Sequence, residues 1–146
     1  MSSESAPKSS EVLVGLIQAL QNDADVVDAL GDAGRISIGS PADEQDDPVV
    51  LRLSLFDGDG THRGTGATRH RHTVQASVIA TRDWRESNGI LAMREILDHA
   101  SDVLDIGGGV SWLVPRGPGG TGGPEMSEGQ RTTIAARWRY QTTHIR

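Results

Sequence analysis

The chain has 146 residues, enough to enclose one hydrophobic core, and it carries a formal net charge of −6 with a pI near 5.2. It contains no cysteine, which excludes disulfide bonds and thiolate metal sites. The acidic balance argues against a general nucleic-acid binder, because contacts to phosphates require a surplus of Lys and Arg.

The charged residues have an unusual make-up. Lys8 is the only lysine, and the 20 acidic residues divide into thirteen Asp and seven Glu. Such an Asp-rich, Lys-poor composition resembles that of proteins from salt-accumulating halophiles, although a GC-rich genome would produce part of the same bias. By this analogy alone, the composition indicates a halophilic host.

Residues 1–9 are small and polar and are expected to form a flexible N-terminus. They lack the basic start and apolar run of a secretory signal, and no later segment approaches the ~20 apolar residues of a membrane span. We therefore expect one soluble domain at residues 10–146, made in the cytoplasm and with no membrane contact.

The first part of this domain has helical spacing. Ser9 or Ser10 is suited to cap a helix with one apolar side. The apolar members of that helix are Val12, Leu13, Leu16, Ile17 and Leu20. Asn22 or Asp23 then predicts a second cap, for a short helix ending at Gly31.

Strand patterns follow. A brief alternation at residues 35–38 predicts an edge strand, and the Pro- and Asp-containing segment at 39–47 predicts a loop. Residues 49–56 alternate strictly and predict a strand. The side expected to face the core consists of Val49, Leu51, Leu53 and Leu55.

The central segment, residues 72–104, changes period once. Val74, Ala76, Val78 and Ala80 alternate with polar residues and predict a strand. After a polar break at 81–88, helical spacing begins. The apolar positions of this helix are Ile90, Met93, Leu97, Ala100 and Leu104.

Gly107 to Gly109 are expected to end that helix, and Val110, Trp112 and Val114 predict a short strand. Residues 115–130 contain so much Gly and Pro that a loop is expected there. A closing strand is predicted at 132–142. Its core side would be Ile134, Ala136, Trp138 and Tyr140, with Arg137 and Arg139 on the other side.

Neither strands nor helices of this kind can bury their apolar sides alone, which predicts a layered α+β domain. It should contain a mainly antiparallel sheet of about four to five strands packed against one long helix and an N-terminal helix. The polar residues 57–71 lie between two predicted strands, and a long hairpin with a mobile loop is the simplest connection.

Metal and nucleotide motifs are incomplete. Asp57-Gly-Asp-Gly resembles the opening of a calcium loop, but position twelve is Thr68 where a bidentate Glu is required. The glycine-rich segment at 107–123 lacks the Gly-Lys-Ser/Thr of a phosphate loop. No nucleophile–base arrangement or pair of carboxylates in an apolar setting is evident. We expect no catalytic residue, cofactor or metal, and no enzymatic activity.

The histidines at the end of the hairpin leave an alternative open. His70 and His72 are two residues apart and could share a metal, with His62 or Asp59 as a further ligand. No rigid spacing fixes such a set, so solvated loop histidines are the preferred interpretation.

The basic residues of the hairpin form the main candidate interface. They could contact a phosphate backbone or an acidic protein surface, and the alternative is a solvated, flexible loop. With the arginines of the second loop and the closing strand, the candidate interface residues are Arg63, Arg69, Arg71, His70, Arg116, Arg137 and Arg139.

The order of the elements, from Glu11 to Tyr140, resembles the tail terminator, or tail completion, proteins of long-tailed viruses. The likeness begins with the capped amphipathic helix. In the first half of the chain it continues with Asp25-Val-Val-Asp-Ala-Leu-Gly, Gly34-Arg-Ile and an acidic loop ending in Asp47-Pro-Val-Val-Leu. In the second half it consists of a hairpin, Leu91-Ala-Met-Arg-Glu-Ile-Leu and a closing Trp138-Arg-Tyr.

The resemblance implies an α+β subunit of a homo-oligomeric ring, with six copies expected. Such a ring sits on the tail tube in the neck of the virion, stops tube polymerisation and joins the tail to the head connector. Its partners would be itself, the tail tube protein and the head–tail connector protein. Genome DNA would pass through the ring without sequence-specific binding, and assembly would take place in the host cytoplasm.

Within that ring, residues 57–71 are expected to contact an adjacent subunit or neighbouring ring, and residues 116–129 to form a second surface. The alternatives are another neck ring protein, an adaptor or a stopper, or a small metal- or nucleic-acid-binding module using residues 62–72.

Overall fold

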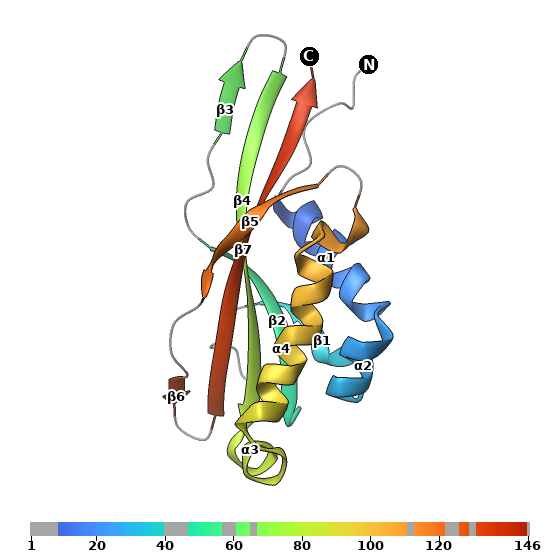
Figure 1. Ribbon diagram of the computed structural model, residues 1–146, viewed down its shortest axis with the longest axis vertical. Coiled ribbons are helices and arrows are strands. Elements are labelled where there is room, and N and C mark those ends of the chain that lie inside the picture. The colour runs from blue at the N-terminus through green and yellow to red at the C-terminus, as the bar shows by residue number, and fades with distance from the viewer. Residues whose placement is uncertain are drawn as a thin grey trace.

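The computed structural model describes residues 9–39, 47–56, 61–64, 67–110, 113–121, 126–128 and 131–145. The elements within these residues are α1 (Ser9–Gln21), α2 (Ala24–Leu30), η1 (Ala33–Arg35), β1 (Ile36–Ile38), β2 (Val49–Phe56), β3 (Thr61–Gly64), β4 (Ala67–Thr81), α3 (Arg82–Asn88), α4 (Ile90–Leu104), η2 (Gly107–Gly109), β5 (Val114–Thr121), β6 (Met126–Glu128) and β7 (Arg131–Ile145). The strands form one sheet, and α1, α2 and α4 lie together on one of its faces (Figure 1). The predicted α+β fold class is confirmed.

The sheet is mixed but mainly antiparallel. Its strand order is β1-β2-β4-β7-β5, with β3 paired to β4 and β6 paired to β7. Only the β1–β2 pair is parallel among these strands. The two 15-residue strands β4 and β7 pair along their whole length and extend past the helix layer (Figure 1).

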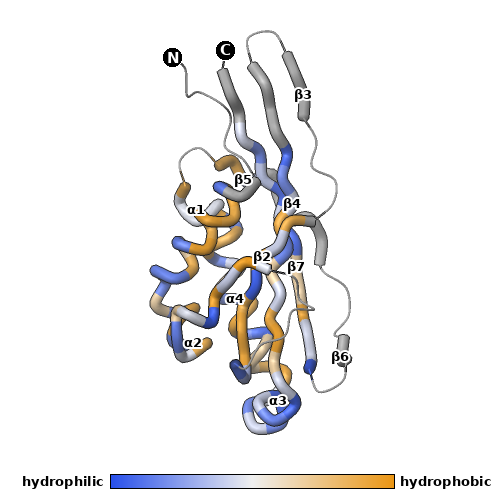
Figure 2. The backbone as a smooth tube through the Cα atoms, turned by 180° about the vertical axis from the view of Figure 1, so that it is seen from behind, coloured by the Kyte–Doolittle hydropathy of each residue, from blue (hydrophilic) through white to orange (hydrophobic). Residues whose placement is uncertain are grey.

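The core lies between the sheet and the helices. Alternate residues of β2, β4 and β7 point into it, and the apolar stripes of α1 and α4 cover them. Figure 2 shows hydrophobic residues recurring along these helices and strands. The fully buried members of the core include Val12, Leu16, Leu20, Leu51, Leu53, Val78, Met93, Ala100 and Leu104. In the closing strand, Ile134, Trp138 and Tyr140 are buried as well. The predicted core faces of both long helices and of the closing strand are therefore confirmed, with Ile90, Leu97 and Ala136 partly buried against the core.

Two aromatic residues of β7 bind the C-terminal end of α4. The Tyr140 hydroxyl donates to the Leu104 carbonyl oxygen at 2.6 Å, and the Trp138 indole Nε1 donates to Asp105 Oδ1 at 2.7 Å. Burial raises the pKa of the Tyr140 phenol far above its ordinary value of 10.0, and the negative charge of Asp105 raises it further. The contacts fix the long helix against the centre of the sheet.

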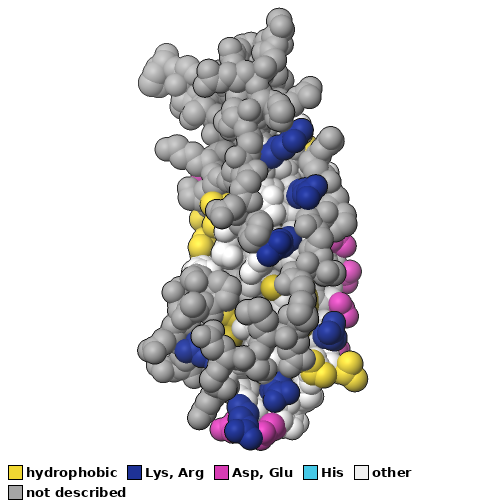
Figure 3. Space-filling model, turned by 90° about the vertical axis from the view of Figure 1, so that its left-hand side faces the viewer, with side chains coloured by type: hydrophobic (Ala, Val, Ile, Leu, Met, Phe, Trp, Pro, Cys, Tyr) yellow, Lys and Arg dark blue, Asp and Glu magenta, His cyan; other side chains and the backbone are white. Residues whose placement is uncertain are grey.

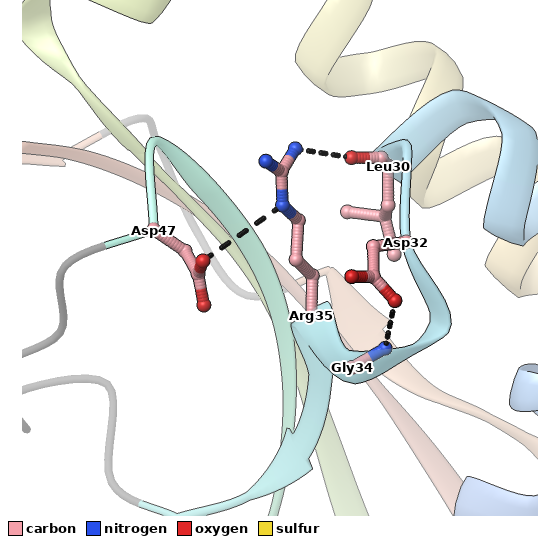
Figure 4. Close-up of polar contacts among 5 residues, drawn as sticks. All are labelled: Leu30, Asp32, Gly34, Arg35 and Asp47. Carbon is pink, nitrogen blue, oxygen red and sulfur yellow. Dashed lines mark hydrogen bonds and ion pairs between the residues drawn. The ribbon is translucent and has the colours of Figure 1, made fainter.

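A compact turn connects α2 to the sheet (Figure 4). Arg35 donates from Nη1 to the Leu30 carbonyl oxygen at 2.6 Å, and its Nε lies 3.9 Å from Asp47 Oδ1 at the approach to β2. The Asp32 carboxylate accepts from the Gly34 N–H at 2.8 Å. One arginine therefore joins the end of α2 to the start of the next strand.

The N-cap of α2 allows a local test. Asp23 Oδ1 accepts from the Val26 N–H at 3.1 Å, so Asp23→Ala leaves that N–H without its partner. We expect a loss of about 1 kcal/mol of unfolding free energy. Asp23→Asn keeps an accepting oxygen and should stay close to the wild type in chemical denaturation, because Asn caps helices as well as Asp does. Equal losses in the two variants would contradict the capping role.

Two expectations about polar segments are wrong. Residues 81–88 were expected as a break, yet Thr81 caps α3 by accepting from the Trp84 N–H at 3.3 Å. Residues 57–71 were expected as the loop of a long hairpin. The antiparallel pairing of β2 with β4 confirms the hairpin, but β3 forms within the expected loop and pairs with the start of β4. Residues 57–60 and 65–66 lie outside the described part. Strand pairing uses backbone groups, so an arm beyond the core can form without apolar alternation.

The expectation of a loop at 115–130 is also wrong where the structure describes these residues, which contain β5 and β6. β5 is an edge strand whose register shifts around Pro118, consistent with the inability of proline to donate a ladder hydrogen bond. The strand expected from Val110 begins only at Val114, and Trp112 lies outside the described residues. At the far end of β2, Leu55 is exposed rather than buried, because the helix layer does not reach it.

Candidate functional site on the outer face of the sheet

The predicted interface residues divide into two groups. The side chains of Arg71, Arg137 and Arg139 lie on the outer face of the sheet, away from the helices. We call these three residues the arginine face. The remaining candidates, whose side chains lie outside the described part of the structure, are Arg63 on β3, Arg69 and His70 on β4, and Arg116 on β5.

Strand register brings the arginine face together from positions far apart in the sequence. Arg139 is paired with Thr73 and Arg137 with Gln75, which places Arg71 diagonally beside Arg139. Diagonal neighbours on paired strands have Cα atoms ~7–8 Å apart, and residues two apart on one strand are ~7 Å apart. The three guanidinium groups thus occupy one patch of like charge.

Hydrogen bonding orients one member of the patch. Arg137 Nε donates to Gln75 Oε1 at 3.1 Å, and Gln75 Nε2 donates to Ser77 Oγ at 3.2 Å. Arg71 and Arg139 are exposed, and no carboxylate among the described side chains pairs with either of them. The patch keeps a positive charge that is accessible to an external partner.

The outer face is not exposed throughout. Towards β2, Arg52 is only 8% exposed, and Ser77 and Ile79 are fully buried. Figure 3 views this side of the molecule and shows Arg side chains spaced along its length. Among the side chains that the structure describes, Arg71 on β4 and Arg139 on β7 are exposed on this face.

Charge is segregated between the two layers of the protein. The central strands β2, β4 and β7 contain no Asp or Glu and six arginines, which are Arg52, Arg69, Arg71, Arg131, Arg137 and Arg139. The helices α1, α2 and α4 contain a single arginine, Arg94, and six carboxylates, which are Glu11, Asp25, Asp28, Glu95, Asp98 and Asp102. Within these six elements, the sheet layer is basic and the helix layer is acidic.

The acidic side includes a groove between α2 and α4, with α3 at one end. Its volume is about 320 Å³, and its lining includes Asp25, Asp28 and Glu95. Glu95 Oε1 lies 3.7 Å from His99 Nε2. The groove is large enough to take the planar head of an arginine or the end of a lysine.

The exposed side of α4 was missed in the sequence-based interpretation. Leu91, Glu95, Asp98 and Asp102 follow one another at intervals of four, three and four residues, so they share one side of the helix, opposite the core. We call this set the acidic stripe. The same 3.6-residue period that predicts the buried side of α4 would have revealed it.

The expectation of solvated histidines is wrong at His72. Its side chain points into the core, is 3% exposed, and its Nε2 lies 3.0 Å from Thr142 Oγ1. The metal alternative receives no support from the described residues, which contain no group of three or more potential ligands. His62, His70 and Asp59 have side chains outside the described part.

None of the helices the structure describes is both long and apolar enough to span a membrane.

Comparison with known proteins shows a similarity of fold. No protein-family model and no curated protein sequence matches the chain. Its fold is similar to a chain in a solved structure, the virion of a native gene transfer agent (GTA) particle. The two chains superimpose with a TM-score of 0.65 at 15% identity, and the match covers 90% of this chain and 93% of the other. At this identity the similarity establishes a shared fold.

Proposed function

We propose that this protein is a structural component of a virion. The observation that carries the proposal is the fold shared with a chain of a gene transfer agent virion, because the match extends over 90% of this chain and 93% of the other. Its specific place would be the head–tail junction. There, copies would form a ring that caps the tail tube, ends its polymerisation and joins the tail to the head connector.

The charge distribution supports assembly into a ring. Identical subunits in a ring meet head to tail, so each must offer two different and complementary surfaces. The basic sheet side and the acidic helix side provide such a pair on one subunit. Six copies are the number that the resemblance to tail terminators implies, and the tail tube and connector proteins would bind the two ends of the ring.

Light scattering and electron microscopy test this role. The purified protein, alone and mixed with tail tubes of a related particle, should form rings of uniform size that bind one end of each tube. A protein that stays monomeric in both preparations and leaves tube ends bare would overturn the proposal. Rings that bind the connector but never the tube would instead indicate an adaptor or stopper ring.

The arginine face favours a second candidate, a nucleic-acid-binding module. Three arginines contacting phosphates would give a slope of about −2.7 for log K against log[salt] on duplex DNA. A mobility-shift series with duplex DNA at increasing salt separates the two candidates. A nucleic-acid-binding module should bind the DNA with this salt dependence, and a structural ring should not.

A further inference from the structure

We propose that the arginine face of one copy docks on the acidic stripe of α4 and the adjoining α2–α4 groove of the next copy. This inference deepens the proposed ring and rests on it, because it names the two surfaces through which the subunits meet. Arg71, Arg137 and Arg139 supply the positive side, and Glu95, Asp98 and Asp102 supply the negative side.

The position of the two surfaces on the subunit fits a head-to-tail contact. The arginine face lies on the outer side of the sheet, and α2 and α4 lie on the other side of it (Figure 1). A surface used by one neighbour therefore leaves the other free for the second neighbour. Repetition of such a contact closes a ring if the rotation between subunits is suitable.

The spacing of the charges also matches. Successive outward residues of β7 are ~7 Å apart, and residues three or four apart on a helix have Cβ atoms ~5–6 Å apart. A strand carrying Arg137 and Arg139 can therefore lie along a helix carrying Glu95 and Asp98 with each guanidinium near a carboxylate. The α2–α4 groove, lined by Asp25 and Asp28 as well, can hold one of these guanidinium heads.

Each surface gathers charge of mainly one sign. Three arginines lie within one patch, and the outward side of α4 carries three carboxylates at helical spacing, with Arg94 four residues before Asp98 and His99 3.7 Å from Glu95. Like charges on neighbouring positions are destabilising, so a partner of opposite charge is favoured on each surface. Leu91, at the start of the acidic stripe, is 76% exposed and adds apolar area that a neighbouring subunit would cover.

Charge reversal with compensation tests the contact. Arg139→Glu should weaken self-association of the full-length protein roughly tenfold or more, because it replaces an attraction with a repulsion between close charges. Glu95→Arg should do the same from the other side. The double variant Arg139→Glu/Glu95→Arg, and an equimolar mixture of the two single variants, should recover association, since each restores opposite charges across the interface. Light scattering measures all four preparations.

Arg82→Glu is the matched control. Arg82 is an exposed arginine on α3, outside both surfaces, and its surface pair with Glu86 contributes little, so the same change in net charge there should leave association unchanged. The proposed interface would be overturned if rings persisted in Arg139→Glu, or if the double variant did not recover the self-association that the single variants lose. The ring itself would remain supported in both cases. A wild-type protein that never associates would overturn the ring as well. Loss of binding to labelled duplex DNA in Arg139→Glu, with self-association intact, would assign the arginine face to nucleic acid.

Discussion

Gly108→Ala should lower the unfolding free energy by about 2–6 kcal/mol, the sum of left-handed backbone strain of about 1–3 kcal/mol and overpacking of about 1–3 kcal/mol. Gly108 has φ +66°, a region in which a side chain is strained. In addition, an added Cβ would lie 2.8 Å from Ala19 Cβ and 3.4 Å from Leu16 Cδ2. Both contacts belong to α1, so the methyl group would push that helix from the core.

Gly109→Ala separates the two costs. Gly109 has a similar φ of +74°, but an added Cβ would meet no atom within 4 Å. This variant should therefore show only the backbone strain, and chemical denaturation of both variants measures the difference. Ala19→Gly removes the atom that clashes, so Gly108→Ala should cost less in that background. Equal losses at Gly108 and Gly109 would show that the approach of α1 has no role.

Tyr140→Ala should cost about 3–5 kcal/mol of unfolding free energy, because it empties a site in the centre of the core between β7 and α4. Tyr140→Phe keeps the ring and loses only the 2.6 Å hydrogen bond to the Leu104 carbonyl oxygen. That bond and its buried acceptor account for about 1–3 kcal/mol. If the Phe variant were as unstable as the Ala variant, the ring itself would contribute nothing.

The change in unfolding free energy at alkaline pH tests the environment of Tyr140 independently. Burial and the Asp105 charge raise the pKa of Tyr140 above its ordinary value of 10.0, so the unfolded chain releases the phenolic proton first. The stabilising effect of the buried, protonated phenol is complete below pH 10.0 and is lost as the pH rises above it. Above that value, the wild type should lose about 1.4 kcal/mol per pH unit relative to Tyr140→Phe.

The chain simplifies this measurement. Tyr140 is its only tyrosine, so phenolate absorbance reports on this residue alone. The absorbance should appear together with unfolding rather than near pH 10.0. A phenolate that forms at its ordinary pKa while the protein remains folded would contradict the buried environment.

Elements that border the core could be predicted from the sequence because one side of each is apolar. The stripe of α1, the alternation of β2 and the period of α4 are direct consequences of burial against a single sheet. Elements outside the core carry no such pattern. α3 depends on the Thr81 cap, and the β3–β4 arm depends on backbone pairing, so both were assigned to irregular structure.

The candidate site shows the same division. Arg137 and Arg139 could be placed on the outward side of a strand from their alternation with Trp138 and Tyr140. Their proximity to Arg71 could not, since it follows from the register of two strands separated by about half the chain. His72 was misplaced because the sequence does not show that the buried side of β4 extends to His72, where Thr142 of β7 provides a polar partner.

The sequence by itself determined the α+β class, the two long helices and the polarity of each surface, because hydrophobic burial imposes periods of 2 and 3.6 on the residues that it involves. Only the tertiary structure decided which charges meet. Pairing of β4 with β7 gathers arginines into one patch, and packing of α2 against α4 gathers carboxylates on the opposite side. Long-range pairing is set by the whole chain at once, so no local pattern records it.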